Sequence, residues 1–120
     1  MPTDIQTKRV YEAPSADDGF RVLVDRVWPR GMTKEKAHID LWLKDAAPST
    51  DLRNEFCHDP AKWEMFKPRY FAELDGKPQA VQVLLDAAAR GRLTLVYSAR
   101  ETQYNQAVAL REYLLARQER

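Results

Sequence analysis

A carboxylate, two guanidinium groups and an indole ring lie within the segment DRVWPRG at positions 25–31. Arg26 and Arg30 carry the planar fork of donors that binds a phosphate or a carboxylate through two hydrogen bonds. Trp28 can stack on a planar ring, and Asp25 can carry a proton. The segment therefore predicts an anion-binding site with Asp25 as a candidate catalytic residue. The competing interpretation is an internal ion pair between Asp25 and an arginine, with Trp28 packed in the core.

A second polar segment, SARET at positions 98–102, leads into the last predicted helix. The free N–H groups at the start of a helix attract anions. Ser98 adds a hydroxyl group, and Asn105 on the first turns of that helix can point into the same crevice. The competing interpretation is a helix cap by Thr102. The segment lacks the glycines of a dinucleotide-binding or phosphate-binding loop, so it specifies no particular ligand.

The run Cys57-His58-Asp59 contains a thiol, an imidazole and a carboxylate in consecutive positions. Catalytic triads are assembled from separate elements, so three neighbours do not normally align as nucleophile, base and orienting group. We expect Cys57 to be packed and Asp59 to cap a helix, and we keep His58 as a second candidate proton carrier. Two histidines and one cysteine without close spacing give no support for a metal site, and no cofactor is expected.

The composition limits the classes of partner. The chain has 120 residues, of which 44% are hydrophobic and 31% are charged, so we expect one globular domain covering residues 1–120. The net charge of +1 makes a nucleic-acid or membrane partner improbable, because those binders need a basic excess. A single cysteine excludes an internal disulfide. The opening residues resemble no signal peptide, so we expect a cytoplasmic protein, and no feature indicates an oligomeric state.

Hydrophobic patterning predicts strands that alternate with helices. Strands are expected over 4–11, 20–28 and 93–97, with a short extended piece over 39–43. Helices are expected after four start signals, at Ser49, Asp59, Pro78 and the segment 98–102. Pro68 lies inside the second of these, so we expect a kink or break near Lys67. The pattern predicts an α/β fold, a single layered domain with a short, mostly parallel sheet flanked by helices.

The two polar segments both follow strands of this sheet. In open α/β sheets, ligands bind beyond the carboxyl ends of the strands. We therefore expect the segments 25–31 and 98–105 to meet at one edge of the sheet and to form a crevice between them.

Several motifs are more specific than these patterns. They are KRVY at 8–11, RVLVDRVWPRG at 21–31, WLKD at 42–45, HDP at 58–60 and TLVYSA at 94–99. In these motifs the chain resembles the YeaO-like family of small bacterial proteins of unknown function. The resemblance covers nearly the whole chain and implies a small cytoplasmic protein, but it implies no activity. Some members are labelled as MarR-like regulators, although this chain shows no winged helix-turn-helix pattern.

A more distant resemblance links the strand-loop-helix Val-Tyr-Ser at 96–98 to rhodanese-like domains. That resemblance implies a cysteine nucleophile at the position of Ser98, and a serine without an evident base is a poor nucleophile. It therefore implies anion binding without sulfur transfer. The function we predict is binding of a small anionic ligand (phosphate, nucleotide or carboxylate), and catalysis is left open. The alternative is a transcription-regulator or protein-complex binding module without enzymatic activity.

Overall fold

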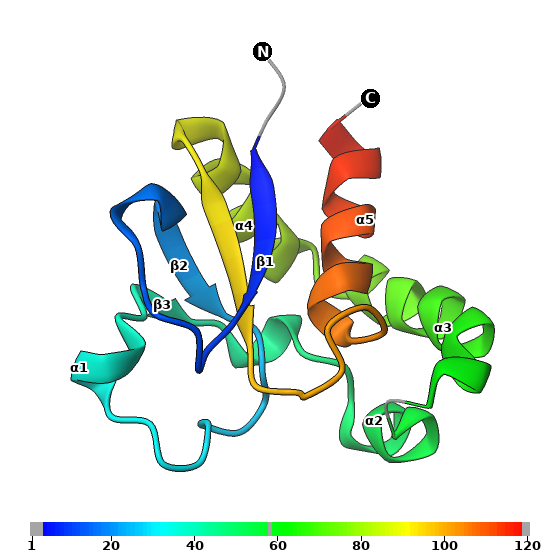
Figure 1. The fold of residues 1–120 in the computed structure, drawn as a ribbon. Coiled ribbons are helices and arrows are strands. Elements are labelled where there is room, and N and C mark those ends of the chain that lie inside the picture. Colours follow the sequence, from blue (N-terminus) through cyan, green and yellow to red (C-terminus); the bar gives the residue numbers. More distant parts are fainter. Residues whose placement is uncertain (1–3, 58, 119–120) are drawn as a thin grey trace.

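The computed structural model describes residues 4–57 and 59–118 (Figure 1). Within them the strands form one parallel sheet in the order β1-β4-β2-β3. The strands are β1 (Ile5–Arg9), β2 (Phe20–Leu23), β3 (Leu41–Trp42) and β4 (Leu93–Tyr97). The α-helices are α1 (Lys34–Ala37), α2 (Thr50–Phe56), α3 (Trp63–Asp75), α4 (Pro78–Arg90) and α5 (Gln106–Gln118), and short 3-10 helices are η1 (Ala16–Asp18), η2 (Lys44–Ala46) and η3 (Pro60–Lys62). The α/β fold predicted from the sequence is confirmed.

Strand β4 lies inside the sheet, as its unbroken apolar sequence predicts. All five of its residues are buried, and Leu93 pairs with Ile5 of β1 on one side and Phe20 of β2 on the other. Strand β2 is shorter than expected: it ends at Leu23, and the chain then leaves the sheet at the polar segment 25–31. This early exit places Asp25 beyond the carboxyl end of the sheet.

One face of the sheet is covered by helices. Helices α4 and α5 pack on the strands, and α3 packs on both of these helices (Figure 1). Side chains alternate along β2, so that Val22 joins this core while Leu23 points to the opposite face. Helix α2 packs against α3 and so lies at the margin of this layer. Among the described residues, no helix is both long and apolar enough to cross a membrane.

The opposite face is covered by the short helix α1 and by connecting segments. Its small core contains Leu23 and Val96, with Trp28 and Trp42 packed against them. The two indole rings meet edge to face, with their centroids 5.3 Å apart. Both faces are therefore covered, as the apolar centre of the second strand predicts, but this face has a much thinner cover than the other.

A buried network of charges lies beside this small core. The Asp18 carboxylate accepts hydrogen bonds from the Arg21 guanidinium (2.6 Å) and from Lys8 (3.1 Å), and Arg21 also donates to two backbone carbonyls at the end of α1. Asp18 and Arg21 are each only 3% exposed. The network ties η1, β1, β2 and α1 together where there are few apolar contacts.

The sequence predicts a kink or a break near Lys67; helix α3 continues through Pro68 without a break, and a kink stays a prediction. Proline removes one backbone hydrogen bond of a helix. Here the buried rings of Phe66 and Tyr70, on either side of Pro68, stack with their centroids 5.4 Å apart. Tertiary packing on both sides of Pro68 thus outweighs its low helix propensity.

Candidate functional site

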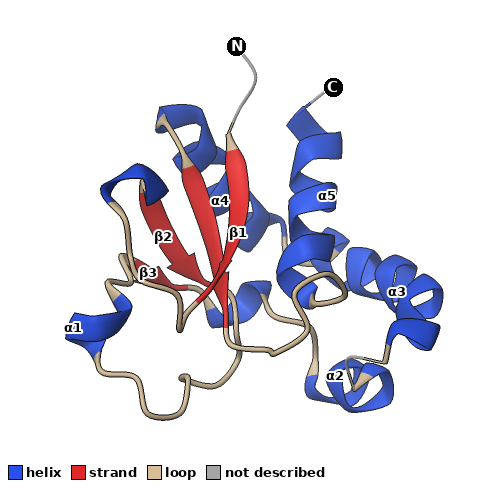
Figure 2. Cartoon of the chain, viewed as in Figure 1, coloured by secondary structure: helices blue, strands red, loops and turns tan. Residues whose placement is uncertain are grey.

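The two polar segments meet at the carboxyl edge of the sheet. Strands β2 and β4 are parallel neighbours, so the segments that follow them leave the same end of the sheet (Figure 2). The Asp25 carboxylate accepts a hydrogen bond from the Ser98 N–H at 2.9 Å, which joins the two segments directly. The expected meeting of 25–31 and 98–105 is confirmed.

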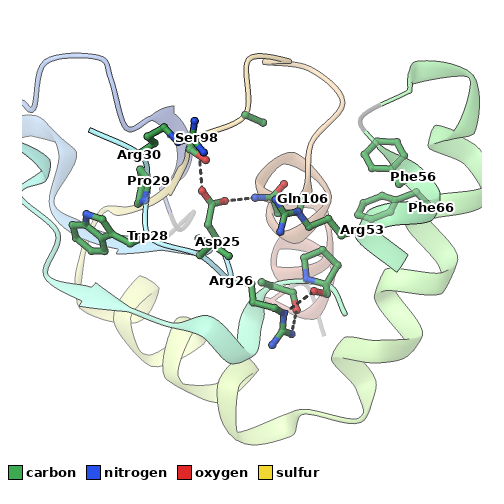
Figure 3. Close-up of a pocket in the computed structure, with 14 residues that line it drawn as sticks. Asp25, Arg26, Trp28, Pro29, Arg30, Arg53, Phe56, Phe66, Ser98 and Gln106 are labelled. Atoms are coloured by element: carbon green, nitrogen blue, oxygen red, sulfur yellow. Dashed lines mark hydrogen bonds between the residues drawn. The ribbon is translucent and has the colours of Figure 1, made fainter. Parts of the chain in front are cut away.

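A cavity of about 340 Å³ lies between these segments and the neighbouring helices (Figure 3). The loop after β2 supplies most of its polar lining, and α2, α3, α5 and the segments 47–48 and 98–99 supply the rest. The lining residues on which the argument below depends are Asp25, Arg26, Arg30, Arg53, Ser98, Ala99 and Gln106.

Asp25 is the central polar group of the site. Its carboxylate is 8% exposed and accepts hydrogen bonds from the Ser98 N–H and from the Gln106 side-chain amide (Figure 3). The bond from Ser98 uses the first N–H group after β4, which sequence reasoning had left open for a ligand. Asp25 therefore holds the loop after β4 and the first residue of α5 in fixed positions.

Removing the Asp25 carboxylate should mainly increase the mobility of the loop after β4, with a moderate loss of overall stability. Asp25→Ala leaves one buried and one partly buried donor without their acceptor, so we expect it to lower the free energy of unfolding by about 1–3 kcal/mol. Asp25→Asn should cost less, because the Gln106 amide can rotate and accept from the new amide. Hydrogen exchange of the Ser98 N–H, followed by NMR, should speed up in the alanine variant. Unchanged protection of Ser98 in that variant would show that Asp25 does not hold the loop.

Arg26 points towards the backbone of the segment before α2. Its guanidinium donates to the carbonyl oxygens of Pro48 (3.3 Å) and Ala47 (3.4 Å). The expected ion-binding role of Arg26 stays a prediction, and the structure adds a positioning role: Arg26 links the loop after β2 to one wall of the cavity.

Helix α3 fixes the same wall from the other side. The buried Tyr70 hydroxyl donates to the Ala46 carbonyl, and burial raises the pKa of Tyr70, so this hydroxyl keeps its proton. The Glu73 carboxylate accepts from the Ser49 N–H (2.8 Å) and from the Ser49 hydroxyl (2.6 Å). Tyr70 and Glu73 of α3 thus anchor this wall through three hydrogen bonds.

Trp28 and Arg30 differ in the contacts that their side chains make. The Trp28 indole donates to the Met32 carbonyl at 2.6 Å and packs on Trp42, but Trp28 also lines the cavity, so its ligand-binding role stays a prediction. Arg30 is exposed, and only its backbone carbonyl has a partner, the Tyr11 hydroxyl at 2.7 Å. Within residues 4–57 and 59–118, no group accepts a hydrogen bond from the Arg30 guanidinium.

Two polar lining residues were missed by sequence reasoning, Arg53 and Gln106. Arg53 lies three residues before Phe56 on α2, so the two side chains share one side of the helix. In the described part of the chain, the Arg53 guanidinium has no hydrogen-bond or ion-pair partner. The spacing of Arg53 from the buried Phe56 was a usable signal, but nothing in the sequence showed that α2 borders the sheet edge.

Asn105 caps a helix and does not line the cavity. Helix α5 begins at Gln106, so the competing interpretation of the segment, a helix cap by Thr102, is wrong. The Asn105 side chain accepts from the Val108 N–H (3.1 Å) and donates to the Glu101 carbonyl (2.7 Å), and it is fully buried. Ser98, in contrast, lines the cavity as expected.

The structure describes two residues of the Cys57-His58-Asp59 run, Cys57 and Asp59. Cys57 is exposed at the end of α2 with a left-handed backbone (φ 51°), so the expectation that it is packed is wrong. Asp59 caps η3 by accepting from the Ala61 N–H at 3.0 Å, as expected. His58 lies outside the described residues. Among the residues described, no cluster of three or more His, Cys, Asp or Glu side chains has the geometry of a metal site.

Comparison with known proteins places the chain in a family. It matches the family described as "Inactive DUF488-N3 subclade" over residues 4–120. It is 42% identical to the uncharacterized protein YeaO of Escherichia coli K12 over 111 residues, which is 92% of this chain and 96% of the relative. It is 37% identical to the uncharacterized protein Rv3073c of Mycobacterium tuberculosis H37Rv over 115 residues, 96% of this chain and 97% of the relative. No solved structure matches significantly. The chain therefore belongs to the inactive DUF488-N3 subclade, the family of the YeaO-like proteins.

Proposed function

We propose that this protein binds a small anionic ligand in the cavity at the carboxyl edge of the sheet. The observation that carries the proposal is the lining: three arginines, Arg26, Arg30 and Arg53, and one acidic residue, Asp25, border the cavity. Clustered arginines repel one another unless they have anionic partners. The Asp25 carboxylate already accepts hydrogen bonds from Ser98 and Gln106, so an anionic ligand would add a partner for these arginines.

The positive character is local to this cavity. The whole chain has a net charge of only +1, so a general attraction for polyanions is not supported. Arginine forks bind phosphates, nucleotides and carboxylates alike, and all three are candidate ligands. The family description as inactive agrees with binding without turnover. Proton transfer by Asp25 or His58 stays a prediction and is no part of this proposal.

Arg53 gives the sharpest test because it is exposed and its loss should leave the fold intact. We expect at least one anion from a panel of inorganic phosphate, nucleotides and small carboxylates to raise the melting temperature. At ten times the dissociation constant the gain is about 1.4 kcal/mol, or roughly 4–8 °C for a chain of this length. Arg53→Gln should remove most of this shift, measured by differential scanning fluorimetry.

Arg90→Gln is the matched control. Arg90 is an exposed arginine at the end of α4, beside the start of β4 and so at the opposite edge of the sheet. Its replacement removes the same charge and should leave the ligand-induced shift unchanged. The proposal fails if no anion in the panel stabilises the protein, or if the two variants lose the shift equally.

A further inference from the structure

We propose that Tyr11 is a positioning residue of the anion site: its hydroxyl holds the loop after β2 so that Arg30 is kept at the cavity. This inference rests on the proposed function and extends it to a residue that lies outside the cavity lining. The geometry that points to it is a pair of hydrogen bonds from the end of β1 to the two segments that border the cavity.

The end of β1 is a third strand end at the carboxyl edge of the sheet. Strand β1 runs parallel to β4, and Arg9 pairs with Tyr97, the last residue of β4. The Val10 N–H continues this pairing by donating to the Tyr97 carbonyl at 2.7 Å, and Val10 is 1% exposed. A turn follows, in which the Glu12 N–H donates to the Arg9 carbonyl (3.0 Å) and the Glu12 carboxylate accepts from the Arg9 N–H (3.0 Å). The backbone on both sides of Tyr11 is therefore fixed by the sheet and by this turn.

The side chains of Arg9 and Tyr11 join the two polar segments a second time. The Tyr11 hydroxyl donates to the Arg30 carbonyl at 2.7 Å. The Arg9 Nε donates to the Ala99 carbonyl at 3.0 Å, and the Arg9 guanidinium lies over the Tyr11 ring, 4.8 Å from its centroid. Arg30 and Ala99 both line the cavity. The segments that Asp25 joins in the interior are thus also joined at the surface, through residues that do not themselves border the cavity.

Arg30 is the lining residue that depends on this contact. Its exposed side chain has no acceptor in the described part of the chain, so its direction is set by the backbone that carries it. The Arg30 carbonyl belongs to the peptide that leads into Gly31, whose φ of 75° lies in the region that glycine adopts freely. The Tyr11 hydroxyl fixes the orientation of that peptide. A guanidinium held in place before the ligand arrives loses less conformational freedom on binding, so the anion is bound more tightly.

A double-mutant cycle on Tyr11 and Arg30 tests the inference. Isothermal titration calorimetry with inorganic phosphate, adenosine monophosphate and acetate identifies the anion that binds most tightly, and the cycle is measured with that probe. We expect Arg30→Gln to weaken its binding at least about tenfold and Tyr11→Phe to weaken it about threefold to tenfold. In the Arg30→Gln background, Tyr11→Phe should cause no further loss, because its effect passes through Arg30. A residue that merely stabilised the fold would give the same fold-change in both backgrounds.

Tyr113→Phe is the matched control. The Tyr113 hydroxyl donates to the Asp75 carboxylate at 2.6 Å, outside the cavity lining, so its removal should leave the affinity unchanged. Tyr11→Phe should fold normally, because Tyr11 is 44% exposed and phenylalanine keeps the ring that Arg9 contacts. The inference is overturned, with the proposed function left in place, by unchanged affinity in Tyr11→Phe or in Arg30→Gln, by a Tyr11→Phe loss that persists in the Arg30→Gln background, or by an equal loss in the control. A protein that binds none of the three probes would overturn both.

Discussion

Asp18→Asn should lower the free energy of unfolding by about 3–5 kcal/mol, because it leaves a buried guanidinium without its anion. The Arg21 side chain is 4% exposed and has Asp18 as its carboxylate partner at 2.6 Å. Asp18 also accepts from the Ser15 N–H at 3.0 Å and from Gln6 at 3.3 Å, so the substitution disturbs a turn and a strand as well. Urea unfolding followed by circular dichroism at pH 7 measures the effect.

The loss of stability caused by Asp18→Asn should depend on pH. Burial acts to raise the pKa of Asp18, but hydrogen bonds from the Ser15 N–H, Lys8 and Arg21 outweigh it and hold this pKa below its ordinary value of 3.8. Between the two values the unfolded chain binds more protons, so the contribution of Asp18 is complete above pH 3.8 and is lost as the pH falls through the folded-state pKa. The difference between wild type and Asp18→Asn should therefore shrink in acid.

Asp17→Asn is the control for this prediction. Asp17 is the exposed neighbour of Asp18 in the same 3-10 turn, and its replacement should change stability by no more than about 0.5 kcal/mol. A loss below 1 kcal/mol for Asp18→Asn at pH 7, or a loss that stays constant as the pH is lowered, would contradict the role assigned to the buried ion network.

Gly19→Ala should lower the free energy of unfolding by a similar amount, about 3–5 kcal/mol, because an alanine side chain would strain the backbone and clash with a neighbouring strand. Gly19 has φ 67° and ψ −134°, a conformation that L-residues with a side chain rarely adopt. An added Cβ would lie 2.3 Å from the Arg92 carbonyl oxygen, which is a backbone atom held by the Phe20 N–H at 3.0 Å. Neither Gly19 nor Arg92 can move away without breaking the backbone contact between the start of β2 and the start of β4. Thermal and urea unfolding both measure the loss.

Gly31→Ala separates the two causes. Gly31 also has a positive φ, 75°, but an added Cβ there meets nothing within 4 Å. We expect this control to cost about 1–2 kcal/mol, the penalty of a left-handed backbone alone. Equal losses in the two variants would mean that the close approach of Gly19 to Arg92 contributes nothing.

The meeting of the two polar segments at one sheet edge was predictable from the sequence, because it follows from the positions of the strands and their parallel direction. The apolar run at 93–97 indicated an interior strand, and a parallel sheet puts the segments after its strands on one side. The positions of Asp25 and Ser98 follow from these two facts. The same reasoning could not choose between Trp28 as a stacking surface and Trp28 as a core side chain, since its partner Trp42 comes from a strand of only two residues.

Other features depend on tertiary contacts that no local pattern contains. Helix α5 begins at Gln106 because Asn105 is buried and caps it, although Thr102 is an equally good cap by residue type. Helix α3 passes through Pro68 because two aromatic rings pack across it. Arg53 reaches the cavity because α3, which is distant in sequence from the strands, holds α2 beside the sheet edge.

A crystal structure of the protein grown with sodium phosphate, with a second crystal grown with sodium acetate, tests the central claim most directly. The account predicts a bound anion within hydrogen-bond distance of the Arg53 or Arg30 guanidinium in at least one of the two crystals. A cavity that holds only water in both crystals, while the anions occupy other surfaces or none, would contradict the assignment of this cavity as the ligand site.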